Sequence, residues 1–161
     1  MHILTVEMIR KAVELVRPSA NKILKTKGTT WGPRWVMGCI ALRDYKATSI
    51  PFTFGTFSEG WREEWGEYKN FSEIAYAKLE VVLREGMSTR LVVANQPWNL
   101  KAGEYLYSGG VTRGNICVAV SGAKGSTDEG IAEMVLSTII MLAQLETSER
   151  IEAKNNKIQR G

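Results

Sequence analysis

The first part of the chain carries the repeat of an amphipathic helix. Between residues 5 and 27, apolar side chains recur three and four positions apart, which predicts one buried helical face: Ile9, Ala12, Val13, Val16, Ala20, Ile23 and Leu24. Thr5 is a suitable N-cap, and Gly28 is a suitable residue to end the helix. Pro18 has no backbone N–H to donate, so we expect a kink or a break into two helices near Arg17.

Two β-strands are expected next. Residues 35–42 are apolar at nearly every position, which predicts a central strand covered on both faces. Residues 49–57 alternate between apolar and polar positions, and Pro51 predicts an edge strand because proline cannot donate to a ladder. Residues 44–46 supply the turn of a hairpin.

A second helix is expected over residues 71–85, where an apolar stripe at helical spacing ends before Gly86. The stretch before this helix contains Trp61, Trp65 and Tyr68 at spacings of four and three. We expect a short helical turn or an ordered loop there.

The second half of the chain predicts three short strands and then a long helix. The expected strands are residues 90–94, 104–107 and 115–121. Ser126-x-x-Glu129 has the form of a capping box, so the last helix should begin at Ser126 or Thr127. Its inner face is a continuous apolar stripe: Ile131, Met134, Val135, Thr138, Ile139, Leu142 and Leu145.

This order of elements indicates an α+β fold, because hairpin-linked strands alternate with helices. We expect a mostly antiparallel sheet of about five strands flanked by helices. The sequence has no G-x-G-x-x-G and no P-loop motif, which argues against a doubly wound nucleotide-binding fold. We divide the chain into a single domain at 1–145 and a polar C-terminal tail at 146–161.

Composition and charge limit the classes of partner that the sequence favours. The 161 residues are 44% hydrophobic and 24% charged, which is ordinary globular usage. The net charge of +4 comes from residues 1–46, where nine Lys/Arg against three acids give +6. These bases are spread around a helix, so we interpret them as a solvated face and expect no nucleic-acid partner.

No apolar run reaches the ~18 residues of a membrane span, and no secretory signal is visible. We therefore expect a cytoplasmic protein with no membrane partner.

The sequence contains few side chains of the types that usually act as nucleophile or general base. His2 is the only histidine, which argues against Ser-His or Cys-His catalysis and against histidine metal sites. Cys39 and Cys117 lie in apolar runs, where we expect them to be buried. We predict no metal site and assign no catalytic residue. An enzyme of this sequence would have to use acids, and four lie beside the Trp61–Tyr68 segment: Glu59, Glu63, Glu64 and Glu67.

A glycine pair and a serine–glycine pair flank a predicted strand near the start of the last helix. Gly109 and Gly110 precede this strand, and Ser121 and Gly122 end it. Glycines allow close approach of a ligand to the backbone, and a helix start presents free N–H groups. Asp128 in the first turn disfavours a strongly anionic ligand, so a neutral or metal-assisted small molecule is expected rather than a phosphate ester.

This region resembles a known family. Gly109-Gly110-Val111, the strand at 115–122 and Asp128-Glu129-Gly130-Ile131-Ala132 resemble the C-terminal half of the GlcG/HbpS-like haem-binding family. That family has a glycine turn, a G-x-I/V-x-V-S-G strand and a D-E-x-I/V-A helix start. Ile74-Ala75-x-x-Lys78 is similar to its I-A-x-x-K-A segment. The sequence departs from the family's D-x-x-G turn at Arg43-Asp44-Tyr45-Lys46, and the Trp61–Tyr68 segment has no counterpart.

The resemblance implies a profilin-like α/β/α domain that forms homo-oligomers and binds haem or another small molecule. It also implies Lys78 as a basic partner of the ligand. The candidate ligand-binding residues are therefore Gly109, Gly110, Ser121, Gly122, Lys78 and Asp128. The cofactor stays open, because His2 lies at the terminus and the other candidate iron ligands also fit packed positions: Tyr107, Met37 and Cys117.

Three functions remain at this point. The first is an oligomeric small-molecule-binding protein, the second is an enzyme using Glu or Asp acid–base chemistry on a small organic substrate, and the third is a non-catalytic assembly subunit. Six aromatic residues would serve helix packing, an oligomer interface or a ligand pocket: Trp61, Trp65, Tyr68, Trp98, Tyr105 and Tyr107.

Overall fold

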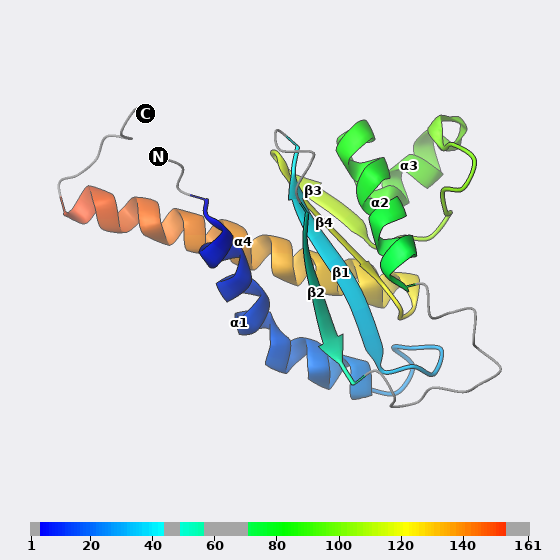
Figure 1. Cartoon of the computed structure of the whole chain (residues 1–161), viewed down its shortest axis with the longest axis horizontal. Coiled ribbons are helices and arrows are strands. Elements are labelled where there is room, and N and C mark those ends of the chain that lie inside the picture. The colour runs from blue at the N-terminus through cyan, green and yellow to red at the C-terminus, as the bar shows by residue number, and fades with distance from the viewer. Residues whose placement is uncertain (1–3, 44–48, 57–70, 154–161) are drawn as a thin grey trace.

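The computed structural model of the chain describes residues 4–43, 49–56 and 71–153 (Figure 1). Its elements are, in order, α1 (Val6–Lys25), β1 (Trp35–Leu42), β2 (Ser49–Gly55), α2 (Phe71–Glu85), α3 (Thr89–Asn95), the 3₁₀ turn η2 (Pro97–Asn99), β3 (Gly110–Arg113), β4 (Ile116–Ser121) and α4 (Gly125–Glu152). The α+β class is confirmed, and the described residues form four strands rather than about five. The Trp61–Tyr68 segment and its neighbouring acids lie outside the described residues.

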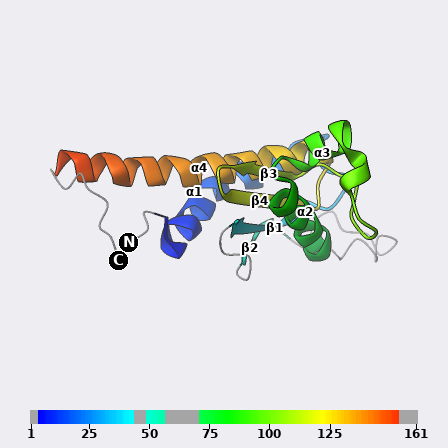
Figure 2. The ribbon, with the colours of Figure 1, turned by 90° about the horizontal axis from the view of Figure 1, so that it is seen from above.

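The sheet is antiparallel, with strand order β2-β1-β4-β3. The long helices α1 and α4 cover one of its faces, α2 covers the other, and α3 lies beside α2 (Figures 1 and 2). Strand β1 is central as predicted, with Cys39 opposite Pro51 of β2 and Ala119 of β4. Strand β2 is an edge strand as Pro51 predicted.

Side chains of helices bond to the two edge strands. Arg17 of α1 donates to the carbonyl of Thr53 over 2.6 Å, and Asn21 accepts from the N–H of Gly55 over 2.8 Å. At the other edge, Thr89 of α3 accepts from the N–H of Gly110 over 3.0 Å. Both edge strands therefore have backbone groups occupied by neighbouring helices.

The first two helices follow the sequence closely. Thr5 caps α1 by accepting from the N–H of Met8 over 3.1 Å. The helix stays continuous through Pro18, so the expected break into two pieces does not occur. Helix α2 has the predicted bounds and ends at Gly86, whose φ of 69° fits a glycine C-terminal stop.

Helix α4 buries most of the predicted face, including Ile131, Val135 and Ile139, against the sheet and α1, but Leu145 is exposed because the helix extends beyond the sheet there. Its start differs from the prediction. Lys124 is the N-cap and makes no side-chain capping bond, while the Glu129 carboxylate accepts from Arg90 instead. The expected capping box is therefore wrong, because the helix begins at Gly125 and Ser126 lies inside its first turn and not at the N-cap.

Helix α4 also runs past residue 145, to Glu152. It is the one described helix that is long and apolar enough by composition to cross a membrane. Its buried residues pack against the sheet and α1, so its apolar character is also that of a core helix. The division of the chain at residue 145 stays a prediction.

Three segments between α2 and β4 correct the sequence analysis. Residues 90–94 lie in helix α3 rather than in a strand, and Ser88 caps this helix by accepting from the N–H of Leu91 over 3.3 Å. Residues 104–107 are neither helix nor strand. Strand β3 forms instead at Gly110–Arg113, where no strand was predicted.

Candidate ligand-binding site

A buried ion pair lies at the centre of the predicted site. Lys78 of α2 donates from Nζ to Asp128 Oδ2 of α4 over 3.3 Å and to the carbonyl of Val120 in β4 over 2.8 Å. Each of the two charged residues is only 2% exposed. The pair thus joins helices from opposite faces of the sheet at the end of β4.

Asp128 also organises the connection between β4 and α4. Its Oδ1 accepts from the N–H of Ala123 over 2.9 Å, and the backbone of Gly122 bonds to the same carboxyl group. A carboxylate in the first turn of a helix that reaches back to N–H groups preceding the helix stabilises the helix start. Asp128 therefore has a structural role alongside its ion pair.

Burial moves both members of the pair towards their neutral forms. Burial raises the pKa of Asp128 to about 7, although Lys78 and the backbone donors oppose this shift. Burial also lowers the pKa of Lys78, against the opposing attraction of Asp128. The cost of removing two charges from water outweighs their mutual attraction in each case. The site therefore holds a carboxyl group that titrates near neutral pH.

Gly109 and Gly110 bring the backbone directly against this pair. Gly109 has a φ of 133°, and a Cβ there would lie 2.5 Å from the Val120 carbonyl oxygen and 2.8 Å from Lys78 Nζ. A Cβ on Gly110 would lie 2.6 Å from Val82 and 2.9 Å from Thr89. Neither position has room for a side chain, so glycine is required at both for steric reasons.

Ser121 and Gly122 complete the group. Ser121 ends β4 and is buried opposite Met37 of β1. Gly122 has a φ of 131°, and a Cβ there would lie 2.6 Å from the Trp35 carbonyl oxygen. The structure therefore brings together all six residues named from the sequence, at the point where β4 meets the start of α4. Their role in binding a ligand stays a prediction.

The segment 96–108, which we call the strap, connects α3 to this site. Its last residue lies over the start of α4, because a Cβ on Gly125 would lie 2.6 Å from Ser108 Oγ. The next residue, Gly109, lies against Lys78. The end of the strap therefore lies beside the ion pair.

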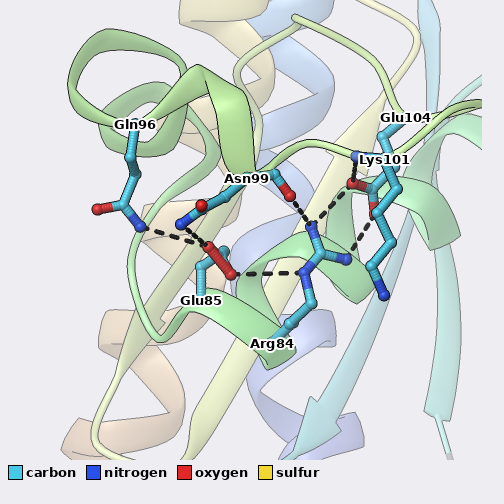
Figure 3. Close-up of polar contacts among 6 residues, drawn as sticks. All are labelled: Arg84, Glu85, Gln96, Asn99, Lys101 and Glu104. Atoms are coloured by element: carbon cyan, nitrogen blue, oxygen red, sulfur yellow. Dashed lines mark hydrogen bonds and ion pairs between the residues drawn. The ribbon is translucent and has the colours of Figure 1, made fainter.

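Two residues at the end of α2 hold the strap (Figure 3). Arg84 binds both carboxylate oxygens of Glu104, over 2.7 and 2.8 Å, and donates to the carbonyl of Asn99 over 3.2 Å. Glu85 accepts from the side chains of Asn99, over 2.7 Å, and Gln96, over 3.3 Å. The sequence analysis missed this network, because ordinary charged residues 11 to 20 positions apart give no local signal.

The strap exposes apolar side chains. Trp98 is 78%, Leu106 68% and Tyr107 59% exposed. The rings of Tyr105 and Tyr107 stack with centroids 5.8 Å apart and an interplanar angle of 18°. Of the predicted aromatic group, these three aromatic residues are described, and none of them packs in the core.

The candidate iron ligands differ in accessibility. Cys117 is buried between the sheet and α2, and burial raises the pKa of its thiol, which opposes the thiolate needed for ligation. Met37 is half-buried in β1, while Tyr107 is exposed on the strap. His2 lies outside the described residues. A phenolate is a known haem ligand, and Tyr107 is the most exposed of the three described candidates.

Comparison with solved structures shows the fold. The chain is similar to the Klebsiella pneumoniae protein ORFY of family DUF336, with a TM-score of 0.52 and 14% identity over 87% of this chain and 90% of that one. It is also similar to PduOC, solved as a haem complex, with a TM-score of 0.54 and 15% identity over 84% and 94% of the two chains. The Ybr137w protein gives a TM-score of 0.49 and 16% identity over 85% and 78%.

No protein-family model matches the sequence. No curated protein matches it either. The resemblance to the GlcG/HbpS-like family is confirmed at the level of the fold, which this chain shares with the GlcG-like DUF336 protein.

Proposed function

We propose that this protein binds a small molecule at the end of β4, between the Gly109–Gly110 turn, the Ser121–Gly122 strand end and the start of α4. The observation that carries the proposal is that Gly109 lies against the buried pair of Lys78 and Asp128 and the Gly122 backbone bonds to Asp128, with Gly110 and Ser121 next to them in the chain. Polar groups that converge from separate elements are typical of binding sites. The fold shared with a protein solved as a haem complex supports the same class of function.

The charges of the site favour a neutral ligand with both a hydrogen-bond donor and an acceptor. Lys78 supplies a donor and Asp128 an acceptor, and together they carry no net charge. Lys124 is engaged elsewhere, with its Nζ 4.8 Å from the centroid of the Trp31 ring. A free phosphate ester would find no uncommitted cation among these residues, which makes it the poorer candidate.

Haem is one candidate ligand, and it would supply an iron that binds diatomic ligands or passes electrons. Tyr107 is the described residue we propose as its ligand, with Tyr105 stacked beside it. We expect weak binding that does not depend on His2. Haem titration of the wild type and His2→Ala should give the same Soret shift, and Tyr107→Phe should lose it. Tyr76→Phe, which removes an exposed phenol on α2, is the matched control.

The site itself is tested by a crystal soaked with haem or with a library of neutral fragments. Density in contact with Gly110, Ser121 or Gly122 would support the proposal. Density far from all three residues would overturn it and move attention to the Trp61 and Trp65 segment.

Acid–base catalysis is a second candidate function. It is favoured by the pKa of Asp128, which burial raises to about 7, because a carboxyl titrating near neutrality serves as a general acid or base. A screen for turnover of small carbonyl compounds, with Asp128→Asn as the inactive control, tests this alternative.

We further propose that the protein is cytoplasmic and forms a homo-oligomer. Helix α4 supports self-association, since Met141 and Leu145 are each 52% exposed and one helical turn apart. Sedimentation at micromolar concentration should show a species larger than the 18.0 kDa monomer. A single species at the monomer mass would contradict this.

A further inference from the structure

The ion pair of the proposed site is buried, and the end of the strap lies beside it. Lys78 and Asp128 are each 2% exposed, and the backbone of Gly109 lies against Lys78 Nζ. Ser108, the last residue of the strap, lies over Gly125 at the start of α4. A ligand can therefore contact these two charged groups only after the end of the strap has moved.

The strap is built to move with little loss of apolar burial. Trp98, Leu106 and Tyr107 are exposed and Leu100 and Tyr105 are half-buried, so lifting the strap would expose further apolar surface from only two large side chains. Residues 100–109, all described, form neither helix nor strand, and the backbone bond to the sheet that opening must break is that from the Val120 N–H to the Gly109 carbonyl, over 2.9 Å. The free energy that keeps the strap in place must come largely from its polar contacts.

Two glycines with positive φ bound the part of the strap nearest the site. Gly103 has a φ of 87° and open space for 4 Å around the place where a Cβ would lie, while Gly109 has a φ of 133°. Such residues tolerate large changes of backbone dihedral angle, as hinges require. The segment between them contains Leu106 and Tyr107, the two exposed side chains closest to the site in sequence.

The polar contacts that hold the strap converge on α2. The Arg84 guanidinium binds Glu104 through two bonds, and Glu104 also accepts from the N–H of Lys101 over 2.6 Å. The Arg84 and Glu104 side chains are 26% and 11% exposed, so this bidentate pair is partly shielded from water. It is the strongest single contact between α2 and the strap.

We propose that the strap is the gate of the ligand site and that the Arg84–Glu104 pair holds it shut. This inference rests on the proposed function for its biological meaning, since it assigns the control of access to that same site. Opening would swing residues 103–109 away from α2 and expose Lys78 and Asp128. A ligand or partner would displace the strap by binding to the exposed side chains of Leu106 and Tyr107.

Amine labelling of Lys78 tests the gate without any ligand. The wild type, Glu104→Gln and the control Glu129→Gln are treated briefly with acetic anhydride at one pH, and modification of Lys78 is followed by peptide mass spectrometry. Glu129→Gln removes one partner of the Arg90 ion pair away from the strap. Exposed Lys11 is the internal reference. Glu104 is not among the groups that shift the pKa of Lys78, so a change in rate reports exposure of the amine.

We expect Lys78 in Glu104→Gln to be modified about tenfold faster than in the wild type, as the loss of one charge-assisted bidentate contact predicts. Lys78 in Glu129→Gln should be modified at the wild-type rate. Cys39 and Cys117, buried between α2 and the sheet, report wider unfolding through their reaction with a thiol reagent. Their rates should not change.

Two results would overturn the gate. One is an unchanged Lys78 rate in Glu104→Gln, and the other is a parallel rise of Lys78 and thiol labelling, which would mean that α2 leaves the sheet. Failure of the proposed function has a different signature, because soaked crystals or haem titration would then show no ligand while Lys78 labelling still rises in Glu104→Gln.

Discussion

Gly109 lies so close to Lys78 that a Cβ at position 109 would be 2.8 Å from the lysine Nζ. The same Cβ would be 2.5 Å from the carbonyl oxygen of Val120, which accepts a bond from that Nζ. The turn and the ion pair are therefore mutually dependent, and any side chain at 109 must displace one of the partners of Lys78.

Replacement of Gly109 by alanine should destabilise the protein by about 3 kcal/mol or more, since it adds backbone strain to a clash with a buried network. Gly103→Ala is the matched control, because Gly103 also has positive φ but has open space around it. The control should lose only about 1 kcal/mol. Urea unfolding followed by tryptophan fluorescence measures both, and equal losses would show that the clash is relieved at no cost.

The Lys78–Asp128 pair should behave as a coupled unit. Lys78→Met or Asp128→Asn alone should cost about 3–5 kcal/mol, because each leaves a buried charge without its partner. The double variant should lose much less than the sum of the two single losses. A double-mutant cycle in urea gives the coupling, and strictly additive losses would show that the two side chains do not interact.

The pH dependence of stability should carry the signature of Asp128. Its pKa is raised from 3.8 to about 7 on folding, so its contribution to stability is fully present below pH 3.8 and is lost as pH rises towards 7. The wild type should therefore lose stability relative to Lys78→Met/Asp128→Asn between pH 4 and 7, by at most about 1.4 kcal/mol per pH unit. A relative stability that stays flat between about pH 4.5 and 7 would mean that Asp128 is ionised throughout this window.

Val135→Asp should be severely destabilising, by about 4 kcal/mol or more, because Val135 is fully buried between α4 and the sheet and a carboxylate there has no partner. Met141→Asp on the same helix is the control, since Met141 is 52% exposed and should tolerate the charge. Thermal unfolding of the two variants compares the inner and outer faces of α4 directly.

Sequence patterns predicted the bounds of a helix correctly where a long apolar stripe was followed by a residue that ends helices. Helix α2 is such a case, because its stripe begins at Phe71 and ends before Gly86. Residues 90–94 show the opposite. Leu91, Val92 and Val93 favour a strand by composition, but Ser88 caps a helix here and Val92 packs as its buried face. In so short a segment the capping residue carried more information than β-propensity.

Most residues of the candidate site could be predicted from the sequence, but the contacts between them could not. The glycines and Asp128 stand out in the sequence because they surround a strand end and a helix start. Lys78 is 50 residues from Asp128, and only a family resemblance indicated it. The bonds of Arg84 and Glu85 to the strap depend on how α2 and residues 96–104 meet in space, which no local pattern encodes.

The helix side chains that bond to the sheet edges also restrict how this protein can misassemble. A foreign strand approaching β2 would have to compete with Arg17 and Asn21, and one approaching β3 would have to compete with Thr89. Domain-swapped polymers and cross-β fibres grow by such strand addition. The native state therefore resists the addition of a foreign strand at the edges formed by β2 and β3. Substitution of Asn21 or Thr89 would leave a backbone N–H of an edge strand free to pair with a foreign strand.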